Sequence, residues 1–169
     1  MECEESLQHL DRVIEEVRRI CRDLSPSILE NLGFAAAVRW LVDNFAKTYK
    51  IKVNIDSAEI DHVFSREAQI VIYRILQEAL GNIGKHAQAR HVTIRIQKQN
   101  GAVDFLIEDD GKGFDVKQAL MRGPAERGLG LPVMEERVHM LRGTCILQSE
   151  EGKGTNITFS IPIEEALHG

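Results

Sequence analysis

The chain has 169 residues and a net charge of −5, from 21 basic and 26 acidic side chains, which argues against nucleic-acid binding because such surfaces concentrate Lys and Arg. Its cysteines, Cys3, Cys21 and Cys145, are too few and too scattered to predict a disulfide framework or a zinc site, which favours a reducing, cytoplasmic location. No apolar run approaches the length of a membrane span, so we expect no membrane contact by this segment, although the parent protein can be membrane-anchored elsewhere.

The first predicted element is a helix over residues 5–24. Its apolar side chains alternate in steps of three and four residues, which is the spacing of a coiled-coil seam: Leu7, Leu10, Ile14, Val17, Cys21 and Leu24. Two interpretations remain open, a helix packed on its own domain and one helix of an intermolecular bundle. We favour the bundle, because no segment nearby in the sequence offers a partner helix of matching length.

The rest of the chain alternates between helices and strands. Amphipathic periodicity predicts three more helices, over residues 34–49, 65–87 and 129–142. Alternation of apolar and polar side chains predicts five strands, over residues 50–56, 91–97, 102–107, 144–149 and 155–162. The charged segment 116–126 is predicted to be a mobile loop. This order predicts an α+β fold, a two-layer α/β sandwich whose mixed sheet carries helices on one face and is solvated on the other.

The most informative motif follows the strand over 102–107. In Asp109-Asp110-Gly111-Lys112-Gly113, a carboxylate precedes two glycines, so that an acceptor and bare backbone lie together. The acid can accept a base N–H, while the glycines let a ring or phosphates approach closely. Taken alone, such a motif is more often a simple turn than a ligand site.

Two other segments fit the same ligand. On the helix over 65–87, Glu78, Asn82 and Lys85 follow at steps of four and three residues, so they share a face at the rim of the apolar stripe. One amide oxygen there, together with phosphates, would hold Mg²⁺, although an ordinary solvated face fits this pattern too. Gly128 and Gly130 lie where the helix over 129–142 begins, and free N–H groups favour phosphate there; a flexible hinge is the alternative.

In combination, these motifs resemble the ATP-binding domain shared by gyrase, heat-shock chaperones, histidine kinases and mismatch-repair ATPases. Within that superfamily, three stretches are similar to nitrate-sensor-type (NarL-partnered) histidine kinases: residues 22–29, 77–87 and 130–137. The resemblance extends from about residue 10 to Pro162 and implies the Bergerat-type ATP-binding fold. It implies two domains, with residues 1–25 as the truncated second helix of a dimerisation bundle and residues 26–169 as the catalytic domain.

The resemblance also implies a role for each site residue. Asp109 would accept the adenine amino proton, with Gly111 and Gly113 leaving room for the base and sugar. Asn82 would ligate Mg²⁺, with Glu78 as a further ligand, a water-holder or a base. Thr155 would support Asp109 or a bound water. The remaining implied ATP contacts are Lys85, His86, Arg127, Gly128, Leu129, Gly130 and Leu131.

In this family the phosphate acceptor is a histidine followed by an acidic residue, and no such pair occurs in the sequence. The resemblance therefore implies an ATP- and Mg²⁺-dependent protein-histidine kinase module, which is not expected to phosphorylate itself. Its acceptor would be a helix missing from this chain, and the phosphoryl group would pass to the receiver domain of a response regulator. The full-length protein would be a homodimer.

Two alternatives remain. The first is a non-catalytic module in which nucleotide controls dimerisation or interaction. The second is an ATP hydrolase of the chaperone or gyrase kind, with Glu78 activating water. The hydrolase is disfavoured, because those proteins continue into transducer domains and only seven residues follow Pro162 here.

Overall fold

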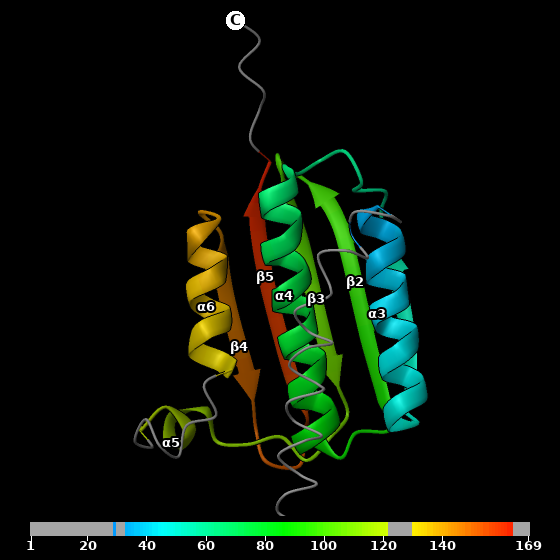
Figure 1. Cartoon of the computed structure of the whole chain (residues 1–169). Helices are drawn as coiled ribbons and strands as arrows, with labels where there is room; N and C mark the ends of the chain where they lie inside the picture. Colours follow the sequence, from blue (N-terminus) through cyan, green and yellow to red (C-terminus); the bar gives the residue numbers. More distant parts are fainter. Residues whose placement is uncertain (1–28, 30–32, 122–129, 164–169) are drawn as a thin grey trace, which may run out of the picture.

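A mixed five-stranded sheet forms one layer of the protein (Figure 1). A computed structural model of the chain describes residue 29 and residues 33–121 and 130–163. The strand order is β1-β2-β3-β5-β4, in which β1 and β2 are parallel and every other pair is antiparallel. The strands are β1 (Lys52–Ser57), β2 (His91–Gln99), β3 (Ala102–Asp109), β4 (Thr144–Ser149) and β5 (Thr155–Pro162).

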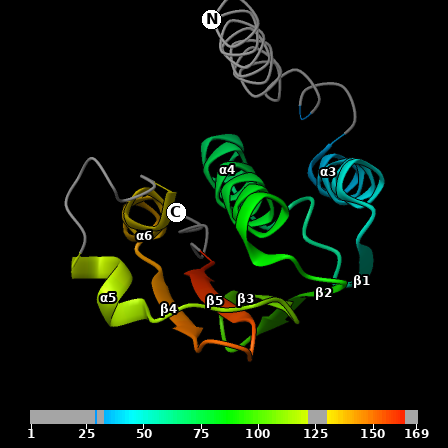
Figure 2. The same cartoon turned by 90° about the horizontal axis from the view of Figure 1, so that it is seen from below.

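Three helices form the second layer and cover a single face of the sheet (Figure 2). They are α3 (Phe34–Tyr49), α4 (Arg66–Asn82) and α6 (Gly130–Met140). The central helix α4 contacts both of its neighbours, α3 and α6. The predicted two-layer sandwich is therefore confirmed. None of the helices in the described residues is long and apolar enough to cross a bilayer.

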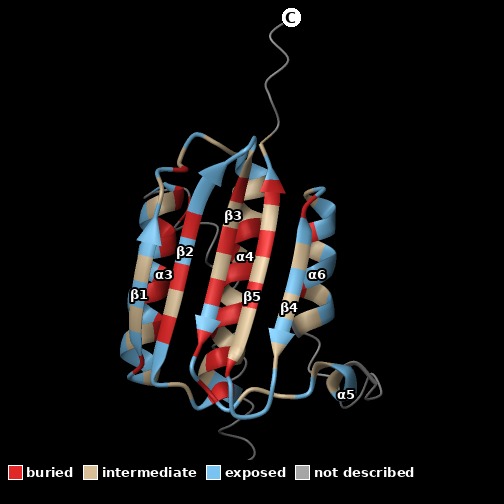
Figure 3. Ribbon diagram, turned by 180° about the vertical axis from the view of Figure 1, so that it is seen from behind, coloured by how far each residue is buried: buried red, intermediate tan, exposed pale blue. Residues whose placement is uncertain are grey.

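The core lies between the two layers because each strand alternates its apolar side chains toward the helices. Phe105 of β3 and Phe159 of β5 are opposite each other in the sheet and stack with ring centroids 4.5 Å apart. The other face carries polar side chains such as Thr93 and Arg95, and Figure 3 views the sheet from that side. Along β3 the buried positions are Val103, Phe105, Ile107 and Asp109. A carboxylate thus occupies the last core-facing position of an otherwise apolar series.

Local sequence explains where the long helix α4 begins. Ser65 is its N-cap, and the Ser65 hydroxyl accepts a hydrogen bond from the Ala68 N–H at 3.2 Å. At its other end the predicted helix over 65–87 is not regular to the last residue. It continues as a π-helical turn, η1 (Ile83–Ala87), in which the hydrogen bonds span one residue more than in an α-helix.

The segment 116–126 departs from its predicted loop structure. Its first part is a short helix, α5 (Val116–Met121), so the loop prediction was wrong there. The physical reason is a cap, because the Asp115 carboxylate accepts a hydrogen bond from the Gln118 N–H at 3.0 Å. The rest of that segment, like the predicted helix over 5–24, lies outside the described residues.

Candidate functional site

A pocket of about 420 Å³ lies where the C-terminal end of α4 meets the ends of β3 and β5. Apolar side chains of Ala79 and Ile83 contribute from the helix and Ile157 from the sheet, which suits a flat, uncharged ring. Six of the residues predicted from the sequence line it: Asn82, His86, Asp109, Gly113, Leu131 and Thr155.

Asp109 is the buried acid of this pocket, with only 4% of its surface exposed. Its Oδ1 accepts a hydrogen bond from the Gly111 N–H at 2.8 Å, whereas its buried Oδ2 has no hydrogen-bond partner among the described residues. Burial raises the pKa of the Asp109 carboxyl, and the polar groups of Gly111 and Thr155 offset this only in part. A buried acceptor without a partner is costly, so this atom is suited to a ligand N–H donor.

Asp110, the next residue, has a different role. It is exposed, and its Oδ1 accepts hydrogen bonds from the N–H groups of Arg90 at 2.7 Å and His91 at 2.8 Å. Its Oδ2 lies 2.7 Å from the His91 Nδ1. The His91 N–H and side chain, followed by the Arg90 N–H, lower the pKa of Asp110 to about 2. Asp110 therefore ties the loop after β3 to the start of β2, while Asp109 faces the pocket.

The two glycines of the loop are needed for close contact within the protein itself. A Cβ on Gly111 would overlap the Ala87 carbonyl oxygen, and a Cβ on Gly113 would overlap the Glu150 carbonyl oxygen. Gly113 is also left-handed, at φ 58°. Packing within the protein therefore requires a glycine at both positions.

Backbone hydrogen bonds tie this loop to its neighbours on two sides. The Lys112 N–H donates to the Ala87 carbonyl at 2.8 Å, at the end of η1. The Lys112 carbonyl accepts from the Gly152 N–H at 2.6 Å, in the turn between β4 and β5. The loop is therefore held between the π-helical turn and the β4–β5 turn.

Of the two basic side chains that follow Asn82, only one lines the pocket. Sequence spacing places Lys85 on the same helix face as Asn82, but the pocket is lined by Asn82 and His86 and not by Lys85, which is exposed. Residues three and four positions after Asn82 both lie near its face of a helix, so sequence spacing alone did not distinguish Lys85 from His86. Glu78, one turn before Asn82, is half-buried and is also absent from the lining.

Gly84 gives a packing reason for the π-helical turn. A Cβ on Gly84 would lie 2.5 Å from the Tyr49 ring, so the aromatic side chain at the end of α3 rests directly on the backbone of η1. Tyr49 also packs on Phe45, with ring centroids 5.3 Å apart. Gly81 has no such neighbour within 4 Å.

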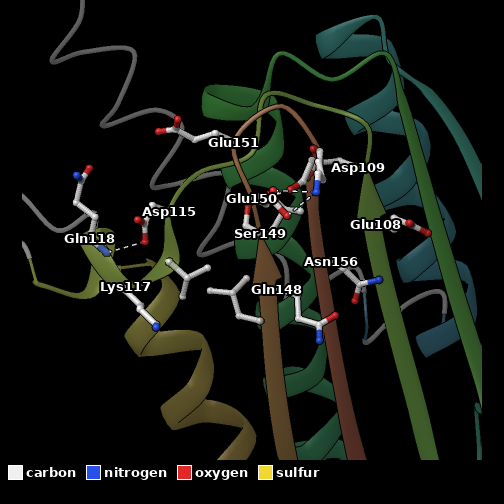
Figure 4. Close-up of a pocket in the computed structure, with 15 residues that line it drawn as sticks. Glu108, Asp109, Asp115, Lys117, Gln118, Gln148, Ser149, Glu150, Glu151 and Asn156 are labelled. Atoms are coloured by element: carbon white, nitrogen blue, oxygen red, sulfur yellow. Dashed lines mark hydrogen bonds and ion pairs between the residues drawn. The ribbon is translucent and has the colours of Figure 1, made fainter.

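Ser149, the last residue of β4, contacts two residues that line the pocket, and the sequence analysis missed it. Its Oγ accepts a hydrogen bond from the Phe114 N–H at 2.9 Å and donates to the Gly154 carbonyl at 2.9 Å. It also lies 3.2 Å from the Thr155 Oγ1 (Figure 4). No sequence motif marks it, because Phe114 is 35 residues away along the chain.

A larger hollow of about 1,030 Å³ borders the same turn and is drawn in Figure 4. Its walls include open-face side chains of three neighbouring strands, Glu108, Gln148 and Asn156, and the exposed carboxylate of Glu150. The end of the long helix does not reach this hollow, because Asn82, Ile83 and His86 line the smaller pocket and not the larger one. The smaller pocket is therefore the candidate nucleotide site.

The other predicted phosphate contacts belong to the segment before α6 and to its first residue. Arg127, Gly128 and Leu129 lie outside the described residues, and Gly130 is the first residue of α6. Within the described ranges, no group of three or more His, Cys, Asp or Glu side chains could hold a metal by itself. Asn82 could supply one oxygen to Mg²⁺, with the other ligands coming from phosphates and water.

Comparison with known proteins identifies relatives along most of the chain. It is 35% identical over 156 residues to the sensor histidine kinase MctS of Rhizobium johnstonii, covering 92% of the chain and 33% of the relative. It is 36% identical over 150 residues to the signal transduction histidine-protein kinase/phosphatase DegS of Brevibacillus brevis, covering 89% and 38%. It is 35% identical over 158 residues to the oxygen sensor histidine kinase NreB of Staphylococcus carnosus, covering 92% and 44%. The chain thus spans less than half the length of each relative.

Solved structures and a family match agree with these relatives. The blue-light activated histidine kinase of Erythrobacter litoralis EL346 has the same fold, with a TM-score of 0.69 and 20% identity, covering 94% of this chain and 51% of that chain. The Acinetobacter baumannii histidine kinase AdeS also shares it, with a TM-score of 0.64 and 20% identity, covering 94% and 81%. Residues 67–165 match the family described as histidine kinase-, DNA gyrase B-, and HSP90-like ATPase. The chain belongs to this ATPase family.

Proposed function

We propose that this chain is the ATP-binding catalytic module of a two-component sensor kinase. It would transfer the γ-phosphoryl group of ATP to a histidine on a dimerisation helix that is not part of this chain. The observation that carries the proposal is the buried, unpartnered Oδ2 of Asp109 in a pocket with apolar walls. Family membership supports ATP as the ligand.

The chemistry of the pocket fits adenine at one end. The Asp109 Oδ2 would accept a hydrogen bond from the adenine amino group, which would remove the cost of leaving that acceptor unpaired. The side chains of Ala79 and Ile83 would pack against the ring. Thr155, which lines the same pocket, would support Asp109 or an ordered water beside it.

The phosphates would extend toward the end of α4. Asn82 would offer its amide oxygen to Mg²⁺, and Glu78 would act as a further ligand, a water-holder or a base. Bound Mg²⁺ would neutralise phosphate charge. His86 and Lys85 would contact the phosphates, together with the segment from Arg127 to Leu131. The protein's contribution is mainly positioning, since phosphoryl transfer demands little covalent chemistry of it.

The partners follow from the same proposal. Residues 5–24 would pair in a homodimeric bundle, residues 26–169 would form the catalytic domain, and the phosphoryl group would pass on to a response regulator in the cytoplasm. Three relatives that are named as histidine kinases, at 35% to 36% identity, support this reading.

Nucleotide titration is the first test. Calorimetry with Mg-ADP should detect binding to the wild-type chain. Asp109→Asn should weaken it about tenfold or more, because the Asn oxygen would stay with the Gly111 N–H and an NH2 donor would replace the free acceptor. Asp104→Asn is the matched control, since Asp104 lies on the same strand but faces the open side, where it bonds the Gln99 amide. Absence of wild-type binding, or equal binding by Asp109→Asn, would refute the proposal.

Phosphoryl transfer is the second test. Labelled ATP should modify a separate helical polypeptide that contains a His-Asp or His-Glu pair, and the 169-residue chain alone should remain unlabelled. Nucleotide binding without transfer to any such helix would favour a non-catalytic interaction module. A steady release of phosphate that depends on Glu78 would instead favour an ATP hydrolase.

A further inference from the structure

The Ser149 hydroxyl joins two backbone segments that both reach the nucleotide pocket. One is the loop after β3, through the Phe114 N–H at 2.9 Å. The other is the β4–β5 turn, through the Gly154 carbonyl at 2.9 Å and the Thr155 Oγ1 at 3.2 Å. Phe114 and Thr155 line the pocket of about 420 Å³, whereas Ser149 itself does not.

The hydrogen-bonding capacity of Ser149 is fully used in this arrangement. A hydroxyl has one donor and two acceptor sites. The single proton goes to the Gly154 carbonyl, one lone pair accepts from Phe114, and the other faces Thr155. Because Ser149 is half-buried, water cannot freely replace these partners when the hydroxyl is removed.

The backbone around Ser149 leaves little room for adjustment. A Cβ on Gly113 would overlap the Glu150 carbonyl oxygen, and a Cβ on Gly154 would overlap the Asp109 carbonyl oxygen. The loop and the turn are therefore in direct contact at Glu150, which follows Ser149 in the chain, and the turn meets the end of β3 at Gly154, whose carbonyl accepts from the Ser149 hydroxyl. A displacement of either segment would be transmitted to Asp109, whose carboxylate faces the pocket.

We propose that Ser149 is a positioning residue of the nucleotide site, which holds the Phe114 wall and the Thr155 wall in the geometry that binds the base. This inference rests on the proposed function, and it adds a residue that touches no nucleotide. A preformed pocket binds more tightly because less ordering is required when the ligand arrives. Ser149 would therefore act on affinity through the position of the pocket walls.

The test measures local opening and affinity separately in three variants of the full chain. Ser149→Ala removes the hydroxyl, and Ser149→Thr retains it. Ser160→Ala is the matched control, since Ser160 is a half-buried serine on β5 that faces the open side of the sheet. Amide exchange is followed by NMR without nucleotide, and Mg-ADP affinity is followed by calorimetry.

In Ser149→Ala, we expect the Phe114 amide to exchange about tenfold faster while the amides of Ile107 and Phe105 keep their protection. We expect the Kd for Mg-ADP to rise about tenfold, and Ser149→Thr to restore both quantities. Ser160→Ala should change neither.

Two results would overturn the inference for Ser149. One is an unchanged Phe114 exchange rate in Ser149→Ala. The other is faster exchange of the Phe114 amide with an unchanged Kd for Mg-ADP, which would show that the hydroxyl stabilises the loop but does not affect nucleotide binding. Failure of the wild-type chain to bind Mg-ADP is a different result, because it refutes the proposed function itself and with it any nucleotide role for Ser149.

Discussion

The two ends of the pocket differ in construction. At the end proposed to hold adenine, Asp109 is buried at the end of β3, and the loop that follows is bonded to η1 on one side and to the β4–β5 turn on the other. At the end proposed to hold the phosphates, His86 lines the pocket from a π-helical turn, and both His86 and the neighbouring Lys85 are exposed. A closely packed end can discriminate a base by shape and hydrogen bonding. Exposed side chains keep their conformational freedom and can adjust to the position of a polyphosphate. Four paired substitutions test this contrast.

The largest effect is expected for Gly154→Ala. Gly154 is left-handed, at φ 78°, and a Cβ there would overlap the Asp109 carbonyl oxygen, so the backbone itself must move. We expect a loss of about 3 kcal/mol in the free energy of unfolding, measured by urea denaturation. Gly152→Ala in the same turn is the control, because Gly152 has φ 80° but no atom within 4 Å of the added Cβ. It should lose only about 1 kcal/mol, and equal losses would contradict the close packing at Gly154.

The second comparison is between two glycines near the junction of α4 and η1, Gly84 in the π-helical turn and Gly81 in the α-helix. Gly84→Ala should cost about 2 kcal/mol because its Cβ meets the Tyr49 ring at 2.5 Å, and it should also weaken Mg-ADP binding. Gly81→Ala lies in α4 with nothing within 4 Å, and it should stabilise the chain by up to about 1 kcal/mol. The double variant Tyr49→Ala, Gly84→Ala should show strong coupling in a mutant cycle. Additive losses would show that the ring does not constrain η1.

The two adjacent aspartates should respond to pH with opposite signs. The pKa of Asp109 is raised by burial, so its ionised form destabilises the folded chain, and Asp109→Asn should gain about 1 kcal/mol at neutral pH. The pKa of Asp110 is lowered from 3.8 to about 2, so its contribution is present above the unfolded value and is lost as pH falls between about 5 and 2.

Stability curves as a function of pH measure both effects. Asp110→Ala should lose about 1 kcal/mol at neutral pH, since two backbone N–H groups lose their acceptor, and should differ less from the wild type at low pH. The gain in Asp109→Asn should also shrink as pH falls. Destabilisation by both substitutions at neutral pH would contradict the division of roles between the two carboxylates.

The smallest effects on stability are expected on the π-helical turn, at the end proposed to hold the phosphates. His86→Ala and Lys85→Ala should each change the free energy of unfolding by less than about 0.5 kcal/mol, because both side chains are exposed. His86→Ala should weaken Mg-ATP binding more than Lys85→Ala, since only His86 lines the pocket. The reverse order of affinities would contradict this pocket lining and favour the predicted position of Lys85 beside Asn82.

The elements were predictable where their signals are local. Three predicted elements coincide with observed ones: the strands over 144–149 and 155–162 with β4 and β5, and the helix over 34–49 with α3. Their signals, alternation and helical periodicity of apolar side chains, depend only on residues close together in the sequence. The π-helical turn was not predictable in this way, since it accompanies a contact between Gly84 and Tyr49 that only the folded chain forms. The role of Ser149 was not predictable either, because its hydroxyl accepts a hydrogen bond from the Phe114 N–H, which is 35 residues away along the chain.

The parallel pairing of β1 with β2 has a consequence for the order of folding. Strands β2 and β3 are joined by a two-residue turn and can pair early, whereas β1 can pair with β2 only after α4 has crossed between them. Asp109 comes from the early hairpin, and Asn82 and His86 come from the end of the crossover helix. The nucleotide would therefore bridge an early and a late unit of the fold. We expect it to slow unfolding of the chain much more than it accelerates folding.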